Sequence, residues 1–328
     1  MSEPAVCEPA VHRPPGHEPL VWLPFDTSEI ADPETGLPPG GLRYEVVDPT
    51  LSVPDSVTEV EFYVTPYQMH SDVAEVLSRM SSLTVVQTLS AGVDNLRGRI
   101  PDGVTLCNGR GIHDTSTAEL ALTLTLASLR GLPRFVRQQD AHEWHGGFER
   151  SLADRRVLIL GYGAIGTAIE ARLRPFECEV VRVARTARDG DAGRIHGFDE
   201  LGDLLPTVDV VILIVPLTAQ TEGMVDAGFL ASMKDGAVLV NVARGAVVVT
   251  EDLIAALRSG RISAALDVAD VEPLPADHPL WQAPHLLITP HVGGASSAMR
   301  PRAHRLVRQQ LVRYAAGEPL ANVMTGEY

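Results

Sequence analysis

The chain has few of the features that mark secreted, membrane-spanning or metal-binding proteins. No apolar run approaches the roughly 20 residues that a membrane-spanning helix needs. Residues 1–19 are rich in Pro and Glu and lack the apolar core of a signal peptide. The cysteines Cys7, Cys107 and Cys178 are too scattered for a disulfide framework or a metal-ligand spacing, which fits a reducing cytosol. We therefore expect a cytoplasmic protein without a metal site, and a disordered tail over 1–19.

Lysine is also scarce, so the basic residues are nearly all arginine. Lys234 is the only lysine, and the formal net charge is −15. This charge argues against nucleic acid or an anionic membrane as the main partner. With 45% apolar and 21% charged residues, the composition is that of an ordinary soluble globular protein. A length of 328 residues makes two domains the default expectation.

Short apolar segments alternate with helical patterns along most of the chain. We expect strands at 20–25, 44–47, 59–64, 84–89, 104–107, 157–160, 179–184, 208–215, 237–242, 263–268 and 286–289. Helical patterns lie between most of them, including 71–80. Such alternation predicts an α/β fold with doubly wound parallel sheets. The segment 118–129 is apolar almost all round, so we expect a helix buried between domains or subunits.

A glycine-rich turn follows the strand expected at 157–160. Gly161, Gly163 and Gly166 have the spacing G-x-G-x-x-G, and a helical pattern follows them. In this context the first glycine permits a tight turn, the second lets the backbone approach a pyrophosphate, and the third lets the helix pack on the strand. A glycine triplet alone also arises in purely structural turns. Its place between a buried strand and a helix favours a dinucleotide site.

Polar residues stand where other expected strands end, the edge at which open α/β sheets bind ligands. Arg244 offers a planar fork of donors for a carboxylate and a carbonyl oxygen, although it could equally be a solvated surface arginine. Asp267 could accept a bond from a carboxamide or could cap a helix. Glu272 could orient a catalytic group or remain a solvated charge. His291 titrates near neutral pH and could exchange a proton, although a lone histidine is more often structural.

The turn Ser90-Ala91-Gly92-Val93-Asp94 lies at the end of the strand expected at 84–89. Its small side chains would leave backbone N–H groups open to a substrate carboxylate. A plain strand-to-helix turn has the same appearance, and the turn by itself favours that structural interpretation.

The combination resembles the D-isomer specific 2-hydroxyacid dehydrogenase family, in particular its glyoxylate and hydroxypyruvate reductases, from about Leu83 to the C-terminal helix. The resemblance is carried by Gly161-Tyr162-Gly163-Ala164-Ile165-Gly166, Val215-Pro216-Leu217-Thr218, Asn241 to Gly245, Asp267-Val268, Glu272-Pro273-Leu274-Pro275 and Thr289-Pro290-His291. It implies a small 2-keto acid reduced by hydride transfer from a nicotinamide cofactor.

The resemblance also implies a role for each residue. Arg244 would bind substrate and His291 would act as acid and base. Glu272 would orient the His291 ring and favour its protonated, charged form. Ala91 and Gly92 would bind the substrate carboxylate, and Trp281 would close the pocket unless it is only a hydrophobic anchor. The cofactor would contact Gly161, Gly163, Ala164, Ile165, Gly166, Arg185, Thr186, Pro216, Thr218, Val242, Ala243, Asp267, His291, Gly293 and Gly294. Asp267 would hold the nicotinamide carboxamide.

The family plan places the cofactor domain, 112–295, as an insertion in a substrate domain made of 20–111 and 296–328. It leads us to expect an active site in the cleft between them and a homodimer with the helix 118–129 near its interface. Closure of such a cleft would expel water from the reacting groups.

One position departs from the commoner pattern of NAD sites, which carry an acidic residue at the end of the second strand. Ala184 stands there instead, followed by Arg185 and Thr186. The missing carboxylate removes repulsion toward a 2′-phosphate, which Arg185 and Thr186 could bind. We therefore predict NADP(H) over NAD(H), unless these side chains are merely exposed loop residues.

Other reactions, and functions other than catalysis, also occur on this scaffold. Glu272 stands where the family's formate dehydrogenases have glutamine, and Ala91 where its phosphite dehydrogenases have lysine, so both reactions are disfavoured. The same scaffold with the same Arg, Glu and His also occurs in dinucleotide-sensing corepressors, which act by binding a partner. A degenerate member that binds cofactor without catalysis is a third interpretation, and the complete triad argues against it.

Overall fold

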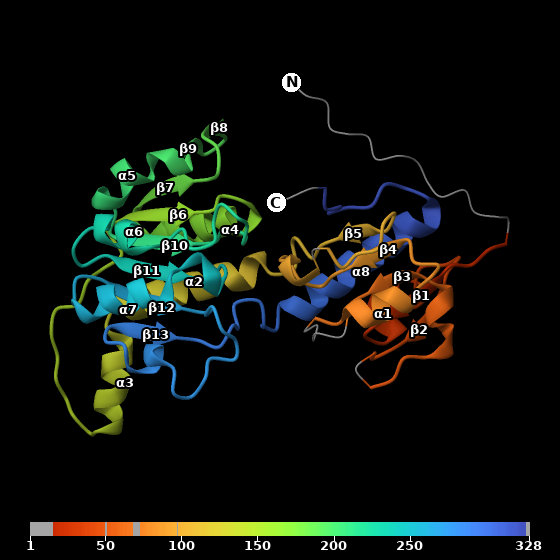
Figure 1. The fold of residues 1–328 in the computed structure, drawn as a ribbon, viewed down its shortest axis with the longest axis horizontal. Coiled ribbons are helices and arrows are strands. Elements are labelled where there is room, and N and C mark those ends of the chain that lie inside the picture. Colours follow the sequence, from red (N-terminus) through yellow and green to blue (C-terminus); the bar gives the residue numbers. More distant parts are fainter. Residues whose placement is uncertain (1–15, 50, 68–72, 97, 326–328) are drawn as a thin grey trace. The chain divides into compact units, whose positions relative to one another are not determined.

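The chain divides into two compact units in the computed structural model, which describes residues 16–49, 51–67, 73–96 and 98–325 (Figure 1). Unit 1 contains the residues up to His113 and those from Ser297 onward, and unit 2 contains Asp114–Ser296. Unit 2 is therefore inserted into unit 1 along the sequence. These limits lie close to the residue boundaries expected for the inserted domain, 112–295.

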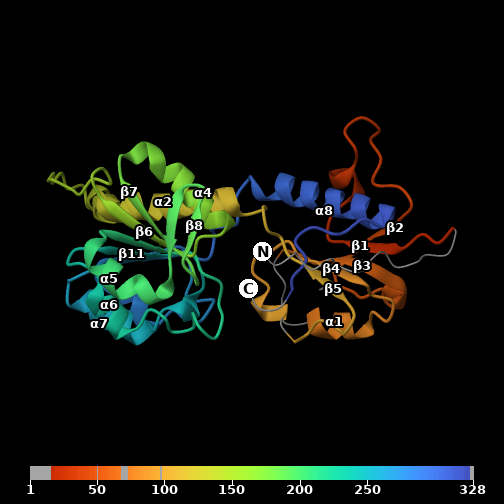
Figure 2. The ribbon, with the colours of Figure 1, turned by 90° about the horizontal axis from the view of Figure 1, so that it is seen from above.

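Unit 1 is built on a five-stranded sheet in which all neighbouring strands are parallel. The strand order is β2-β1-β3-β4-β5, which requires crossover connections between parallel neighbours. One helix covers each face of the sheet, α1 (Val73–Arg79) on one and α8 (Met299–Ala316) on the other (Figure 2). The strands are β1 (Leu20–Leu23), β2 (Arg43–Val46), β3 (Val60–Val64), β4 (Val85–Gln87) and β5 (Thr105–Cys107).

Side chains along β1 alternate between the two faces of the sheet, so this strand packs against both helices. Val21 and Leu23 belong to the core beneath α8, whereas Leu20 and Trp22 belong to the core beneath α1. All four are at most 2% exposed, as expected for a strand covered on both faces. The C-terminal helix thus completes a domain begun by the N-terminal strands.

The predicted tail covers 1–19, of which 1–15 lie outside the described residues. The remaining residues make specific contacts with unit 1. The Pro19 carbonyl accepts from the Arg43 N–H at 3.0 Å, and the His17 ring pairs with Glu61. Ordered structure therefore begins before the expected boundary, because the chain entering β1 already bonds to neighbouring strands.

Unit 2 is built on an eight-stranded sheet in the order β13-β12-β11-β10-β6-β7-β9-β8. All neighbouring strands are parallel except the edge pair β8 and β9. The order reverses between β6 and β10, the switch point at which such sheets bind ligands. The strands are β6 (Arg156–Leu160), β7 (Glu179–Val183), β8 (Arg188–Gly190), β9 (Gly193–His196), β10 (Val210–Leu213), β11 (Val238–Asn241), β12 (Ser263–Leu266) and β13 (Leu286–Ile288).

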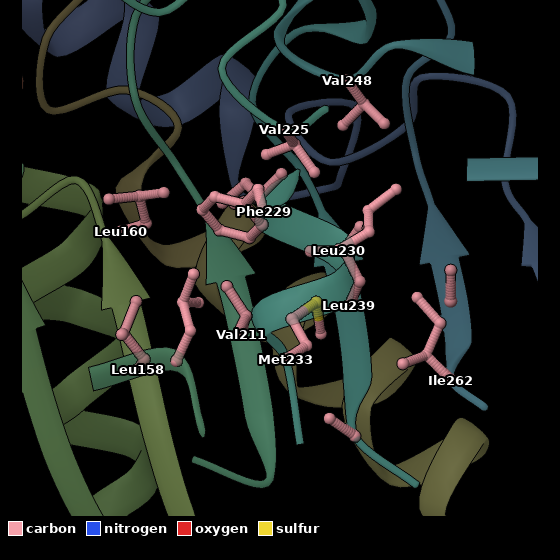
Figure 3. Packing of buried hydrophobic residues seen from close by; sticks show 14 of the residues in the cluster. Leu158, Leu160, Val211, Val225, Phe229, Leu230, Met233, Leu239, Val248 and Ile262 are labelled. Atoms are coloured by element: carbon pink, nitrogen blue, oxygen red, sulfur yellow. The ribbon is translucent and has the colours of Figure 1, made fainter. Parts of the chain in front are cut away.

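Helices cover both faces of this sheet. On one face α2 (Asp114–Leu129) and α4 (Ala164–Leu173) pack over Val157 and Ile159. On the other face lie α5 (Leu201–Leu204), α6 (Ala227–Ser232) and α7 (Thr250–Arg258). Figure 3 shows Phe229 and Leu230 of α6, with Met233 just after it, in the core of the second face with Leu158, Leu160, Val211 and Leu239. The doubly wound fold is confirmed, because each buried strand alternates its side chains between two helical layers.

Two features of unit 2 were not predicted. The hairpin of β8 and β9 was not predicted, because β8 is exposed throughout and only Ile195 of β9 is buried. Helix α3 (Leu132–Asp140) was also missed, and none of its residues is buried. The buried residues of α2 pack inside unit 2 against α4 and the sheet, and its expected place between domains or subunits stays a prediction. Among the described residues, no helix is long and apolar enough to cross a membrane.

Candidate active site

The His291 side chain is paired with a carboxylate from a neighbouring loop. His291 Nδ1 lies 2.6 Å from Glu272 Oε2, and both side chains are partly exposed, at 50% and 37%. Glu272 Oε1 accepts from the Ala269 N–H at 3.0 Å, which fixes the carboxylate on its own loop. Because Nδ1 faces Glu272, Nε2 is the ring nitrogen available for proton exchange with a ligand.

The pair shifts the pKa of each partner in the direction that favours an ion pair. The hydrogen bond to Glu272 raises the pKa of His291, aided by the carboxylate charges, and it outweighs burial and the Arg244 charge. Burial acts to raise the pKa of Glu272, but the bonds from His291 and Ala269 and the charges of His291 and Arg244 lower it overall. Both shifts favour a protonated imidazole beside an ionised carboxylate.

The backbone of His291 is held by Asp267 in an uncommon conformation. His291 has φ = 52°, in the left-handed region that costs a non-glycine residue of order 1 kcal/mol. Its N–H donates to the Asp267 carbonyl at 2.7 Å. The Asp267 carboxylate, in a residue only 2% exposed, accepts from the Val292 and Gly293 N–H groups at 2.9 and 2.7 Å. Thr289 Oγ1 donates to it at 2.6 Å. Asp267 therefore fixes the histidine loop, and a carboxamide contact stays a prediction.

Arg244 follows β11, and its charge acts on both Glu272 and His291. Its Nη1 donates to the Ala243 carbonyl at 2.8 Å. The next residue, Gly245, touches the loop that carries Glu272, since a Cβ there would lie 1.8 Å from the Ala269 carbonyl carbon. Only glycine permits this approach, which brings the Arg244 and Glu272 loops together. The sequence reasoning missed this role, although Gly245 lies inside a quoted motif.

The glycine turn after β6 is tightly packed at Gly166 and open beside Gly163. A Cβ on Gly166 would lie 2.3 Å from the Gly161 carbonyl oxygen, so the helix packs directly on the turn. A Cβ on Gly163 would meet nothing within 4 Å, so protein packing does not demand a glycine there. Gly163 is also the N-cap of α4 and makes no side-chain cap. Open space before helix N–H groups that lack a side-chain cap fits a dinucleotide phosphate.

The other residues predicted on the cofactor side lie along the same edge of the unit 2 sheet or beside it. Pro216 and Thr218 follow β10, where Thr221 Oγ1 donates to the Pro216 carbonyl at 2.6 Å and accepts from the Thr218 N–H at 2.9 Å. Thr221 is 3% exposed and braces this loop, a role that the sequence did not suggest. The remaining predicted positions are Ala164 and Ile165 at the start of α4, the buried Val242 and Ala243 after β11, and Gly294 beside Gly293.

Arg185 and Thr186 are exposed between β7 and β8. Arg188, the first residue of β8, links this segment to the glycine turn. Its Nη1 donates to the Thr186 carbonyl and its Nη2 to the Tyr162 carbonyl, both at 3.3 Å. The segment after β7 is therefore joined to the turn through the missed hairpin.

Trp281 lies in a 3₁₀ helix, Pro279–Gln282, and the residue is 53% exposed. Its Nε1 donates to the Pro275 carbonyl at 2.8 Å. The ring thus anchors the segment that carries Glu272. Its predicted contact with substrate stays a prediction.

In unit 1, the Ser90–Asp94 turn is braced through its carbonyl groups. The Ser90 carbonyl accepts from Thr88 Oγ1 at 2.8 Å and from the Gly109 N–H at 2.7 Å. The Ala91 carbonyl accepts from Asn108 Nδ2 at 2.9 Å. Asn108 is 7% exposed and was missed by the sequence reasoning. These bonds fix the orientation of the peptide groups around Ala91 and Gly92.

These features define the class of protein. A glycine turn at the switch point of a doubly wound sheet, with a His–Glu pair at the ends of strands of the same sheet, is the arrangement of a dinucleotide-dependent oxidoreductase.

The family follows from comparison with known proteins. The model of the "D-isomer specific 2-hydroxyacid dehydrogenase, NAD binding domain" matches residues 122–293. The human glyoxylate reductase/hydroxypyruvate reductase is 34% identical over 261 residues, which cover 73% of this chain and 76% of the human protein. The chain belongs to the D-isomer specific 2-hydroxyacid dehydrogenase family.

Solved structures agree with this assignment. A family protein from Aeromonas salmonicida subsp. salmonicida has a TM-score of 0.83 at 29% identity, covering 94% of this chain and 99% of that one. An NADPH-dependent glyoxylate/hydroxypyruvate reductase from Sinorhizobium meliloti, solved with NADP and sulfate, has a TM-score of 0.79 at 27% identity, covering 94% and 98%. The protein is an oxidoreductase with a nicotinamide dinucleotide cofactor and a small hydroxy or keto acid substrate.

Proposed function

We propose that this protein reduces a small 2-keto acid, glyoxylate or hydroxypyruvate, to the D-2-hydroxy acid, with NADPH preferred over NADH. The proposal rests above all on the His291–Glu272 pair at 2.6 Å, which lies at the ligand-binding edge of the sheet that also bears the glycine turn. The human and Sinorhizobium relatives named for these substrates support the choice of substrate.

In the proposed reaction, His291 Nε2 gives its proton to the carbonyl oxygen of the substrate. The reduced nicotinamide, when bound, supplies the hydride that C2 receives. Glu272 keeps the imidazole oriented and favours its protonated form before transfer. Arg244 holds the substrate carboxylate and carbonyl oxygen and offsets the charge that grows on that oxygen. The Ala91 and Gly92 amides of unit 1 would donate to the carboxylate.

The cofactor preference rests on the absence of a carboxylate after β7. Ala184 stands there, and the exposed Arg185 and Thr186 follow it. Arg185→Ala should raise the Michaelis constant for NADPH much more than that for NADH, because only NADPH carries the 2′-phosphate. Steady-state kinetics with both cofactors measure this, and equal effects on the two would disprove the assignment.

The first experiment follows the loss of reduced-nicotinamide absorbance with NADPH and NADH against glyoxylate, hydroxypyruvate, pyruvate and bulkier 2-keto acids. We expect turnover with the smallest substrates, fastest with NADPH, and lost in His291→Ala. Failure on the whole panel despite measurable NADPH binding would favour the sensor or corepressor interpretation.

The homodimer stays a prediction that rests on the family resemblance. Light scattering on the purified chain during size-exclusion chromatography would measure its mass directly. A monomer at every concentration would disprove it.

A further inference from the structure

Unit 2 contains a buried carboxylate that the proposed reaction does not use. Glu170 lies on α4, and its side chain is 4% exposed. Arg182 of β7 donates Nε to Glu170 Oε2 at 2.7 Å and a second bond, from Nη2, to Oε1. These bonds lower the pKa of Glu170, so it stays ionised. A buried charge requires such a partner, but pairing alone does not explain why a carboxylate is placed here.

The same carboxylate reaches the glycine turn. The Tyr162 hydroxyl donates to Glu170 Oε2, and Tyr162 is the residue between Gly161 and Gly163. The Arg182 guanidinium carbon lies 5.9 Å from the centre of the Tyr162 ring. The Tyr162 carbonyl is held separately by Arg188. The central side chain of the turn is thus fixed at its hydroxyl, and its backbone is fixed at its carbonyl.

We infer that Glu170 is a positioning residue for the dinucleotide, acting through the Tyr162 hydroxyl to hold the glycine turn in its phosphate-binding conformation. This inference rests on the proposed use of a dinucleotide at that turn. Glycines on both sides of Tyr162 leave the free turn many backbone conformations. An anchor formed before binding removes part of the entropy that the ligand would otherwise lose by ordering the turn.

The pyrophosphate is common to NADPH and NADH, so the anchor should affect both equally. Tyr162→Phe removes one hydroxyl and keeps the ring. We expect it to raise the dissociation constants of both dinucleotides by the same factor, about three- to tenfold, the usual worth of one such hydrogen bond. Fluorescence titration of each dinucleotide measures binding without any need for a substrate.

A matched control is available in unit 1. The Tyr44 hydroxyl donates to the Pro39 carbonyl at 2.6 Å, so Tyr44→Phe also removes a tyrosine hydrogen bond. This variant should bind both dinucleotides as the unaltered chain does. Arg185→Ala provides a second contrast, because it should weaken NADPH binding much more than NADH binding.

A double-mutant cycle tests whether the hydroxyl acts through Glu170. Replacing both charges together, in Glu170→Leu/Arg182→Leu, leaves no unpaired buried charge. In that background Tyr162→Phe should change neither dissociation constant further. A full effect of Tyr162→Phe there would overturn the inference, because the hydroxyl would then act without Glu170.

The single variant decides the question if the double variant does not fold. Unchanged dissociation constants in a Tyr162→Phe protein with native circular dichroism would overturn this inference and leave the proposed reaction standing. If the unaltered chain bound neither dinucleotide, the inference and the proposed function would fail together.

Discussion

The two units hold their predicted ligand-binding groups by different means. In unit 2 the groups are charged side chains, and the His291–Glu272 pair is held by the backbone of the Ala269 loop. In unit 1 the predicted donors are peptide groups, braced by neutral hydrogen bonds. There Asn108 Nδ2 holds the Ala91 carbonyl, and Gln87 Nε2 donates to the Thr88 and Asn108 carbonyls at 2.8 and 3.1 Å.

The brace in unit 1 extends to the C-terminal helix. Gln87 and Gln310 are both 0% exposed, and Gln310 Nε2 donates to Gln87 Oε1 at 2.8 Å. Buried side-chain amides need hydrogen-bond partners, and here each amide serves as the partner of the other. They fix the position of the surrounding backbone without adding charge. Unit 2 should therefore govern proton transfer and its pH dependence, and unit 1 should govern only the affinity for the substrate.

The largest expected effect comes from the proton donor in unit 2. His291→Ala should lower the turnover number by about 10²- to 10⁴-fold, the usual contribution of general acid–base catalysis. The matched control is His196→Ala, since His196 Nδ1 lies 2.7 Å from Glu200 Oε2 in another His–Glu pair. An equal loss of turnover in both variants would show that the loss is not specific to the site.

The second-largest effect should come from the contact between Gly245 and the Ala269 backbone, which joins two loops of unit 2. Gly245→Ala forces a Cβ into the Ala269 backbone and should lower the free energy of unfolding by about 1–3 kcal/mol, as overpacking does. Turnover should fall as well, because the Arg244 and Glu272 loops must separate. Gly202→Ala is the control, since a Cβ there meets nothing within 4 Å. Urea denaturation of both variants measures the difference, and equal stabilities would contradict the close approach.

The pH dependence should distinguish the units directly. Reduction requires protonated His291, and Glu272 raises its pKa, so kcat/KM should fall as pH rises through that raised value. Glu272→Gln removes the hydrogen-bonded charge and should move the fall to lower pH. Oxidation of the hydroxy acid requires the neutral His291 ring, so its kcat/KM should instead rise as pH rises through the same pKa. A profile of kcat/KM against pH that is unchanged in Glu272→Gln would contradict the pairing.

The smallest expected effect lies in unit 1. Asn108→Ala removes the donor to the Ala91 carbonyl and should raise the KM for substrate about three- to tenfold, the worth of one hydrogen bond. The NADPH dissociation constant and the pH profile should stay as they are. Ser78→Ala, which removes only a bond to the nearby Glu75 carbonyl, is the control. A shifted pH profile in Asn108→Ala would break the division between the units.

Much of this protein could be predicted from local patterns in the sequence. Apolar runs and helical spacing predicted the parallel sheets, because a strand buried on both faces needs apolar residues at successive positions. The glycine spacing predicted the turn after β6. Arg244, Asp267, Glu272 and His291 stood out because each lies at the end of an expected strand or shortly after it. The carboxyl ends of parallel strands lie at one edge of their sheet.

Only the tertiary structure decided which residues meet. The exposed β8 has no apolar pattern, so its hairpin with β9 and the bonds of Arg188 to the turn had no signal in the sequence. The need for glycine at 245 depends on the distant Ala269, and the anchoring of Tyr162 depends on Glu170 and Arg182. Local periodicity reports which face of an element is buried. Pairings between distant segments depend on how the elements pack, and packing arises only in the folded chain.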